Sequence, residues 1–380
     1  MKKLAVVILN WNGEKLLRRF LPGVVEHSLS EHAGVWVADN GSTDGSAEFV
    51  KREFPGIGLI TLDRNYGFAG GYNRALAGIK AEYYILLNSD VEVTPGWTAP
   101  LLDLMEGDSR VAACMPKILD LEDKGRFEYA GAAGGFIDFL GYPFCRGRIF
   151  DVTEEDNGQY DDVREVFWAT GACMAVRAED WKLFGGFDSG FFAHMEEIDL
   201  CWRMKSGGRR IMVCPASVVY HQGGGTLPGT DPRKTFLNFR NSLSMLLRNL
   251  PGDRLWLVLV RLIGDWLSIV KFIAALSFGN AFAVLRAHFA FFGLLAGNVR
   301  KRREIRRLLL SLPAGRDGEI VSGEAVTGET APRETAAGET ASGNFIPGKS
   351  YPLAGMYRRS IVVDFFILRR RVFSRLGFGD

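Results

Sequence analysis

Residues 4–13 read LAVVILNWNG, and residues 35–46 read VWVADNGSTDGS. Each stretch opens with an apolar, partly β-branched run, Leu4–Leu9 and Val35–Ala38, of the kind that forms a strand buried on both faces of a sheet. Each run ends in a polar turn that contains glycine, and a helical pattern from Glu14 to about Glu26 separates the two. Strand, helix and strand in this order predict a βαβ unit with parallel strands.

The same alternation continues beyond the first unit. Gly107–Phe167 is irregular and glycine-rich, and regular patterns return after it. We expect an α/β domain with a mostly parallel central sheet over residues 1–250. The further expected elements are helices at Ser46–Phe54, Ala69–Ile79, Ala178–Phe184 and Glu196–Lys205, and strands at Ile57–Leu62, Tyr83–Leu87 and Arg210–Val213.

Charge divides the chain into two parts. Residues 1–250 hold 27 Lys and Arg against 33 Asp and Glu, whereas residues 251–380 hold 19 against 11. The five cysteines form no C-x-x-C pair, which argues against a disulfide framework and against a zinc site. The first apolar run is too short for an export signal, so a cytoplasmic protein is expected.

The basic part carries apolar runs. Leu255–Leu276 has the length of a membrane span, but its polar residues share one stripe, which favours an amphipathic helix at a membrane interface. The polar residues are Arg261, Gly264, Asp265, Ser268 and Lys271. A second run, Ala281–Val299, ends at a basic cluster over 300–303. The open alternative is a helical hairpin packed on the catalytic domain or on a second copy of the chain.

The end of the chain contains two more segments. Residues 323–342 form four repeats, GEAVT, GETAP, RETAA and GETAS, with almost no large apolar side chains, so 311–350 is expected to be a disordered linker. Residues 351–380 mix apolar clusters with arginines, which predicts a basic amphipathic helix. The expected organisation is therefore a domain over 1–250, a helical region over 251–310, the linker and this last helix.

Four polar clusters follow the strands or open the helices of the first half, where open parallel sheets bind ligands. Taken singly, each has a simpler explanation, such as an Asx turn, a helix cap or close glycine packing. Their order within 90 residues favours a nucleotide site. The clusters are Asn10–Gly13, Asp39–Ser46, Asn65–Asn73 and Asn88–Asp90.

With these four clusters, the sequence resembles the family 2 inverting glycosyltransferases of bacterial cell-surface glycans, whose nucleotide-sugar domain has the GT-A fold. The resemblance runs from residue 6 to residue 224 in family order and does not reach the last part of the chain. The matching stretches are VVILNWNG, VADNGSTDGS, RNYGFAGGYN, LLNSDVEVTPGW, FWATGACMAVRAEDW, FGGFDSGFFAHMEEIDLCWR and VVYHQGG.

The resemblance implies a role for each matching donor-side residue. Asp90 of the D-x-D position and His221 would hold a divalent metal, Mn²⁺ or Mg²⁺. Asn88 replaces the first aspartate of that position. The residues implied to follow the nucleotide base, ribose and diphosphate are Asn10, Asn12, Asp39, Arg64, Asn65, Gly67, Gly71 and Asn88.

On the acceptor side, the resemblance places the catalytic base at Glu197, and Glu196 stays open because Glu196-Glu197 replaces the usual Glu-Asp pair. It places acceptor contacts at Trp168, Gly171 and Asp199. These roles suit the chemistry, since a divalent cation neutralises a leaving diphosphate and a carboxylate accepts the proton of the attacking hydroxyl. Without the resemblance, the acidic residues would simply be charges at the start of a helix.

The sequence therefore predicts a metal-dependent inverting glycosyltransferase that moves a sugar from a UDP- or dTDP-linked donor to a glycan, lipid-linked because the tail is membrane-seeking. The expected partner surface is the anionic inner face of the plasma membrane; nucleic acid is not expected, and self-association stays open. The rival functions are a sugar nucleotidyltransferase, for which residues 10–13 lack a triphosphate-binding loop, and an inactive nucleotide-binding membrane scaffold.

Overall fold

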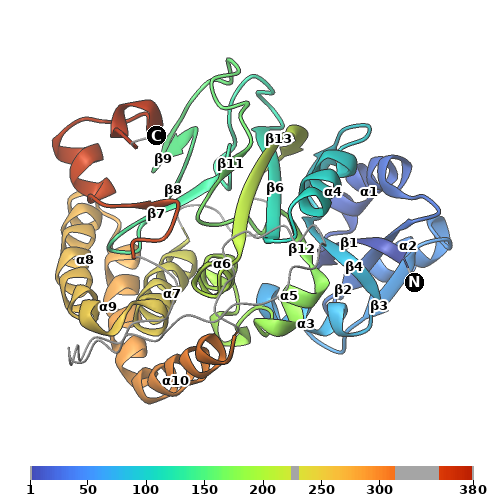
Figure 1. The fold of residues 1–380 in the computed structure, drawn as a ribbon. Helices are drawn as coiled ribbons and strands as arrows, with labels where there is room; N and C mark the ends of the chain where they lie inside the picture. Colours follow the sequence, from blue (N-terminus) through green and yellow to red (C-terminus); the bar gives the residue numbers. More distant parts are fainter. Residues whose placement is uncertain (1, 224–230, 313–350, 379–380) are drawn as a thin grey trace, which may run out of the picture.

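The computed structural model of the protein describes residues 2–223, 231–312 and 351–378. Its central feature is a nine-stranded sheet flanked by helices (Figure 1). The strand order is β11-β13-β6-β12-β4-β1-β2-β3, and β5 pairs with β13. Strands β1 to β4 are mutually parallel, while β12 runs antiparallel between β4 and β6, so the sheet is mixed and mostly parallel.

The first half confirms the predicted alternation, because apolar runs become strands and the amphipathic segments cover them. The side chains of β1 from Leu4 to Val7 are nearly inaccessible, as expected for a strand with helices on both faces. The elements are β1 (Lys2–Asn10), α1 (Glu14–Ser28), β2 (Ala33–Asp39), α2 (Ser46–Glu53), β3 (Gly58–Thr61), α3 (Gly67–Ala77) and β4 (Ala81–Asn88).

The second half of the sheet extends the predicted strand at Arg210–Val213. Strand β13 continues to His221, with a register shift between Cys214 and Val218 along its partner β6. The elements are β5 (Val91–Val93), α4 (Thr98–Gly107), β6 (Val111–Asp120), β11 (Arg164–Glu165), β12 (Cys173–Arg177), α5 (Ala178–Leu183), η1 (Ser189–Phe191), α6 (Glu196–Ser206) and β13 (Arg210–His221).

The irregular segment Gly107–Phe167 contributes a second, five-stranded sheet that the sequence did not predict. Its order is β10-β9-β8-β7-β14, and the last strand comes from the far end of the chain. Its strands are β7 (Gly135–Asp138), β8 (Pro143–Cys145), β9 (Arg148–Ile149), β10 (Val152–Thr153) and β14 (Met356–Tyr357).

The predicted basic helix over 351–380 is wrong. Residues 351–378 form β14, a π-helical turn at Val363–Ile367 and the 3₁₀ turn η4 at Phe373–Leu376. The cause is packing of aromatic rings against the second sheet. The Phe373 and Phe136 centroids lie 4.9 Å apart, and the buried Asp364 accepts a hydrogen bond from the Tyr357 hydroxyl.

Four helices, α7 (Pro232–Asn249), α8 (Trp256–Ala274), α9 (Phe278–Gly293) and α10 (Leu295–Ser311), complete the described chain. In Figure 1, α7, α8 and α9 lie side by side and α10 lies below them. The predicted linker over 311–350 lies outside the described residues, except for its first two.

The polar stripe of α8, apart from the exposed Lys271, faces the protein, which corrects its expected orientation. Arg261 and Asp265 are buried and form an ion pair with 2.7 Å between Nε and Oδ1. Arg261 also donates to the carbonyl oxygen of Leu140 and to the hydroxyl of Ser242. A buried guanidinium needs such partners, so the stripe attaches α8 to the protein and turns its apolar face outward.

No single helix among the described residues has the length and apolar character to cross a bilayer. The α9–α10 pair, bent by 63°, meets those two criteria jointly.

Candidate active site

Two predicted nucleotide-binding residues meet at the carboxyl ends of β1 and β2. Asn10 and Asp39 are register partners, since these parallel strands end at the same edge, and both are at most 2% exposed. Asn10 Nδ2 donates to Asp39 Oδ1 over 3.3 Å, and Asp39 Oδ2 accepts from the Ser42 amide. The pair forms a rigid acceptor group at the sheet edge.

Asn12 closes the same edge from the β1–α1 turn. It has a φ of +51°, a conformation that Asn tolerates better than most residues. The side-chain Oδ1 of Asn12 accepts a hydrogen bond from the Thr43 backbone amide at 2.7 Å, and the backbone amide of Asn12 donates to Ser42 Oγ. The two turns after β1 and β2 are thereby joined into one surface.

The third cluster is held by Asn40, which sequence reasoning did not single out. Its Nδ2 donates to Asn65 Oδ1 and to the Gly67 carbonyl oxygen, and its Oδ1 accepts from the Tyr66 amide. Arg64 is exposed, with its guanidinium carbon 4.8 Å from the centroid of the Tyr66 ring. The segment from Arg64 to Gly67 is thus fixed beside Asp39 while its cation stays accessible.

The two predicted glycines have different neighbours. Gly67 has a φ of +72°, and a Cβ there would lie 2.5 Å from the carbonyl oxygen of Phe192. The Ala69 amide donates to that oxygen at 3.2 Å. A Cβ on Gly71 would lie 2.8 Å from Leu9, so packing of α3 on β1 accounts for this glycine. Gly67 therefore brings the donor-side helix into contact with the loop before α6.

The predicted metal ligands lie together. Asp90 Oδ1 is 3.1 Å from His221 Nε2, and Asn88 Nδ2 is 3.4 Å from the same nitrogen. Glu128, from the irregular segment, lies on the other side of the imidazole, with Oε1 3.3 Å from Nδ1. Burial alone would lower the pKa of His221, but the neighbouring carboxylates of Asp90 and Glu128 raise it to about 10.

This pair fits one divalent cation. Neighbouring ligands of an octahedral ion at roughly 2.1 Å are about 3 Å apart, which is the separation of Asp90 Oδ1 and His221 Nε2. Oxygen and imidazole donors together suit Mn²⁺. Over the described ranges, no three His, Cys, Asp or Glu side chains converge on one point. The protein would therefore supply two ligands, and Nε2 must lose its proton to be one of them.

The loop before α6 carries the two predicted base candidates. Phe192, His194 and Met195 all have positive φ, between 66° and 73°, which is uncommon outside glycine and marks a strained turn. It delivers Glu196 and Glu197, each with a buried Oε2 that accepts no hydrogen bond from the described residues. Buried carboxylates without partners are costly, and such strain and cost are concentrated at functional sites.

The two glutamates differ in accessibility. Glu196 is 3% exposed, whereas Glu197 is only half-buried. Burial raises the pKa of both carboxyls, for Glu197 to about 7, and Glu197 raises the pKa of Glu196 further. A base must reach a substrate and titrate near neutral pH, so these properties favour Glu197 over Glu196.

Asn241 of α7 holds the strained loop and was also not foreseen. Its side-chain amide is fully buried and donates to three carbonyl oxygens, those of Phe191, Ala193 and His194, at 2.8–3.0 Å. Its Oδ1 accepts from the Arg240 guanidinium. A helix outside the matching stretches thus fixes the backbone that positions Glu197.

The structure does not present the predicted acceptor residues as an open surface. Trp168 is 3% exposed, its indole N–H donates to the Phe136 carbonyl oxygen, and its ring packs on Gly135. Its ring is therefore part of the core and offers no platform for a sugar, contrary to our expectation. Gly171 is buried against Phe68.

Asp199, the third predicted acceptor residue, is 1% exposed and pairs with Arg203. Its second oxygen accepts from Asn249 of α7 at 2.8 Å. It therefore fastens α6 to α7.

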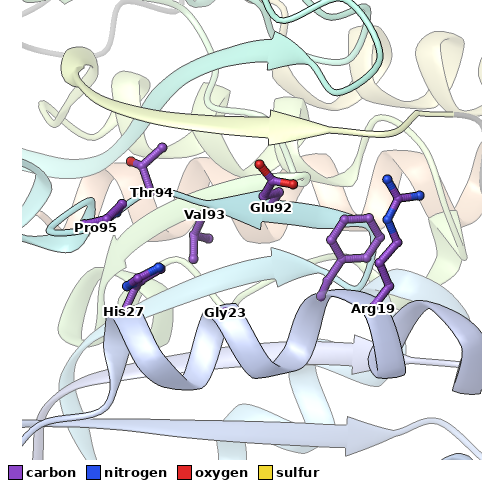
Figure 2. Close-up of a pocket in the computed structure, with 8 residues that line it drawn as sticks. Arg19, Gly23, His27, Glu92, Val93, Thr94 and Pro95 are labelled. Carbon is purple, nitrogen blue, oxygen red and sulfur yellow. The ribbon is translucent and has the colours of Figure 1, made fainter.

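A cavity of about 400 Å³ lies away from these residues. Figure 2 shows it between α1 and β5, with Arg19 and His27 on the helix and Glu92 on the strand. None of its lining residues is a predicted site residue. The candidate active site is instead the open edge formed by the ends of β1, β2, β4 and β13 and the start of α6.

The fold and this edge are of the GT-A type, the class of fold that binds nucleotide sugars. The solved structure of GalNAc-T7 with UDP, GalNAc and Mn²⁺ superposes with a TM-score of 0.51 at 17% identity, covering 65% of this chain and 48% of that one. That likeness supports the fold. Residues 5–160 match the model of Glycosyl transferase family 2.

Curated relatives agree with the family model. An N-acetylglucosaminyl-diphospho-decaprenol L-rhamnosyltransferase of Mycobacterium tuberculosis (strain CDC 1551 / Oshkosh) is 29% identical over 245 residues, which are 60% of this chain and 78% of that protein. The rhamnosyltransferase WbbL of Escherichia coli (strain K12) is 25% identical over 223 residues, 57% of this chain and 82% of its own. Together, the family model and these relatives support a family 2 glycosyltransferase domain of the bacterial-glycan type in this chain.

Proposed function

We propose that the protein transfers a deoxyhexosyl group, L-rhamnosyl, from a pyrimidine nucleoside diphosphate to a sugar hydroxyl on a lipid diphosphate, with inversion. The names of two relatives motivate the transferred sugar, and that of the mycobacterial one the acceptor class. The observation that carries the proposal is the contact of the donor-side helix with the loop before Glu197, through Gly67 and Phe192.

The donor half of the proposal rests on Asp39 and Asn10. Asp39 is buried, so its carboxylate is shielded from water and can accept from the N–H of a pyrimidine base. The adjoining segment from Arg64 to Gly67 supplies a cation and backbone for the diphosphate. A hydrogen bond from the base N–H to Asp39 would form equally well with uracil and with thymine.

Proton transfer belongs to Glu197. As the acceptor hydroxyl oxygen attacks the anomeric carbon, its proton passes to the Glu197 carboxylate, and the bond between that carbon and the diphosphate oxygen breaks. One displacement by an oxygen opposite the leaving group inverts the anomeric centre. Glu197 Oε2 accepts no hydrogen bond from the residues that the structure describes, so a lone pair is available for that proton.

Asp90 and His221 would hold a divalent cation at the donor diphosphate. When bound, the cation neutralises the charge that develops on the leaving diphosphate. Glu128 holds the other nitrogen of His221 and so orients the imidazole towards Asp90.

We also propose that the outward face of α8 and α9, called here the apolar face, rests on the cytoplasmic leaflet of the membrane. A contiguous apolar surface on a protein marks a lipid or protein contact. The side chains of this face, 55–77% exposed, are Trp256, Leu259, Ile263, Trp266, Leu267, Val270, Phe278, Phe282, Phe289 and Phe292.

The test of the proposed function is a transfer assay with the full chain and Mn²⁺. We expect release of nucleoside diphosphate from dTDP-L-rhamnose or UDP-linked sugars only when N-acetylglucosaminyl-diphospho-farnesol is present, with a new disaccharide on that lipid. Nucleotide binding without any transfer across the donor panel would overturn the proposal and leave a binding protein.

A further inference from the structure

Four cations gather between the loop before α6 and the apolar face. Three belong to α7: Arg233, Lys234 and Arg240. The fourth, Arg286, belongs to α9. We call these the cation cluster. Among the described residues, no carboxylate oxygen lies within 4.0 Å of any of their charged nitrogens, whereas nearby Arg248 and Lys301 both pair with Asp188.

The cation cluster lies directly beside the loop before α6. The Arg233 guanidinium carbon lies 5.4 Å from the centroid of the Phe192 ring, and Arg240 donates to the carbonyl oxygens of Gly190 and Phe191. Burial and, to a smaller extent, the charge of Lys234 lower the pKa of His194 to about 4. The cluster therefore acts electrostatically on the loop that presents Glu197.

The cluster also borders the apolar face. Arg240 and Arg286 approach the same ring, that of Phe236, at 5.4 and 5.2 Å from its centroid. On α9, Arg286 stands four residues after Phe282 and three before Phe289, so the three side chains share one face of the helix. Both phenylalanines are more than 60% exposed. Arg286 therefore marks the boundary between the cations and the apolar face.

Arg240 helps to hold the loop before α6, but Arg233 and Lys234 have no comparable role in the fold. Arg233 and Lys234 occupy the first turn of α7, where the helix dipole disfavours positive charge. The nearest carboxylate in sequence, that of Asp231, accepts from the Arg233 backbone amide as the helix cap. Cations kept together without carboxylates, partly shielded by aromatic rings, suit a phosphate-bearing ligand.

We infer that the cation cluster binds the diphosphate of a lipid-linked acceptor. This inference rests on the proposed function and specifies its acceptor site. From Glu197 outward, the protein presents a base, then cations, then an apolar face. A lipid-diphosphate sugar presents its hydroxyl, its two phosphates and its hydrocarbon chain in that same order. Charge complementarity therefore fixes which part of the acceptor each surface meets.

Farnesyl diphosphate tests the cluster without any sugar transfer. We expect the full chain to bind it with excess UDP present to fill the donor site, and to bind farnesol far more weakly. Arg233→Ala/Lys234→Ala should raise the Kd for farnesyl diphosphate by roughly tenfold to a hundredfold, since two charge-assisted contacts are lost. Lys51→Ala/Lys80→Ala removes the same charge from exposed positions elsewhere and should leave the Kd unchanged. An unchanged Kd in the first variant would overturn the inference.

Phosphate could also come from bilayer headgroups, so sedimentation with vesicles of phosphatidylcholine, with and without phosphatidylglycerol, forms a second arm. If Arg233→Ala/Lys234→Ala no longer sediments in response to phosphatidylglycerol but keeps its full affinity for farnesyl diphosphate, the cluster binds lipid headgroups. That result would overturn the inference. Loss of farnesyl diphosphate affinity supports it whatever the vesicles do. If that affinity is lost but no donor supports transfer, the subsite stands and the proposed function falls.

Discussion

The side-chain amide of Asn241 donates to the carbonyl oxygen of His194 at 2.8 Å, across 47 positions of sequence. The same amide reaches the carbonyls of Phe191 and Ala193, so one residue of α7 gathers the backbone of a strained turn. Glu197 lies three residues after His194. The position of the proposed base is thus determined from a helix that lies after the sheet in the chain.

Asn241→Asp should impair turnover without weakening nucleotide binding. Aspartate keeps the size but cannot donate, so three carbonyl oxygens lose their partner and the turn relaxes. We expect kcat to fall by roughly tenfold to a hundredfold, as for a displacement of about 1 Å, with donor affinity unchanged. Asn238→Asp makes the same chemical change on α7 and is the control, because the Asn238 side chain makes no hydrogen bond to the part of the chain that the structure describes. Equal losses in both variants would show a general effect on α7.

Glu197→Gln should reduce turnover by roughly 10²–10⁴, because the amide keeps the shape of the side chain but cannot take the proton. Glu196→Gln removes the charge of the more buried neighbouring carboxylate and should reduce turnover far less. Steady-state rates of both variants, beside unchanged circular dichroism spectra, decide between them. The reverse order of losses would assign the base to Glu196.

The pH profile of kcat/KM should show a decrease on its acidic side near neutral pH. Burial raises the pKa of Glu197 to about 7. Only the ionised form accepts a proton, so kcat/KM should fall as pH drops below about 7 and level off above it. The sign for stability is opposite: a carboxyl whose pKa is raised on folding stabilises the fold at low pH, and this contribution disappears as pH rises through about 7. In Glu197→Gln the decrease on the acidic side of the rate profile should be absent, and the loss of thermal stability with rising pH should be smaller, because only the buried Glu196 then contributes to it.

Metal binding should depend on Asp90, His221 and, indirectly, Glu128. Chelation with EDTA should abolish transfer, and Asp90→Ala should weaken Mn²⁺ binding severely, as followed by electron paramagnetic resonance. Glu128→Gln keeps the ligands but loosens the imidazole, so Mn²⁺ affinity should fall by about tenfold to a hundredfold. Glu122→Gln, at an exposed position of the same segment, should change nothing. Full transfer activity in excess EDTA would exclude the metal.

Charges on the apolar face should release the protein from membranes. In Ile263→Asp/Trp266→Asp, two side chains 71% and 55% exposed become charged, so the folded protein loses lipid contact but no core packing. We expect the variant to stay in the supernatant with vesicles that pellet the unaltered chain, at both low and high salt. Its thermal midpoint should match that of the unaltered chain. Sedimentation of the variant at the original level would rule out this face as the contact.

The meeting of the predicted donor-side residues at one sheet edge was predictable because its determinants are local. Asn10, Asp39 and Asp90 each follow an apolar strand, and parallel strands bring their carboxyl ends to one edge. Glu128 and Asn241 were missed because their roles arise from contacts with His221 and the loop before α6. Both contacts span many residues in sequence, and neither residue stands in a motif.

The helical and C-terminal regions show what periodicity leaves undetermined. The polar stripe around Arg261 was visible in sequence, but a period of 3.6 residues does not say which side of a helix meets the protein. The partners of Arg261, the Leu140 carbonyl oxygen and Ser242, come from distant segments and decide it. The second sheet was missed because its strands have two to four residues, and β14 pairs with β7 over more than 200 positions.

That late strand affects how the chain is made. On the ribosome, β7 leaves the exit tunnel long before Met356 and Tyr357 are synthesised, so one edge of the second sheet waits unpaired through most of translation. An unpaired edge can recruit strands from other chains. Asp138 on β7 waits with it, since the Ile361 amide that its carboxylate accepts from arrives later still. Premature release before codon 356 would therefore yield an aggregation-prone product even though every proposed catalytic residue is already present.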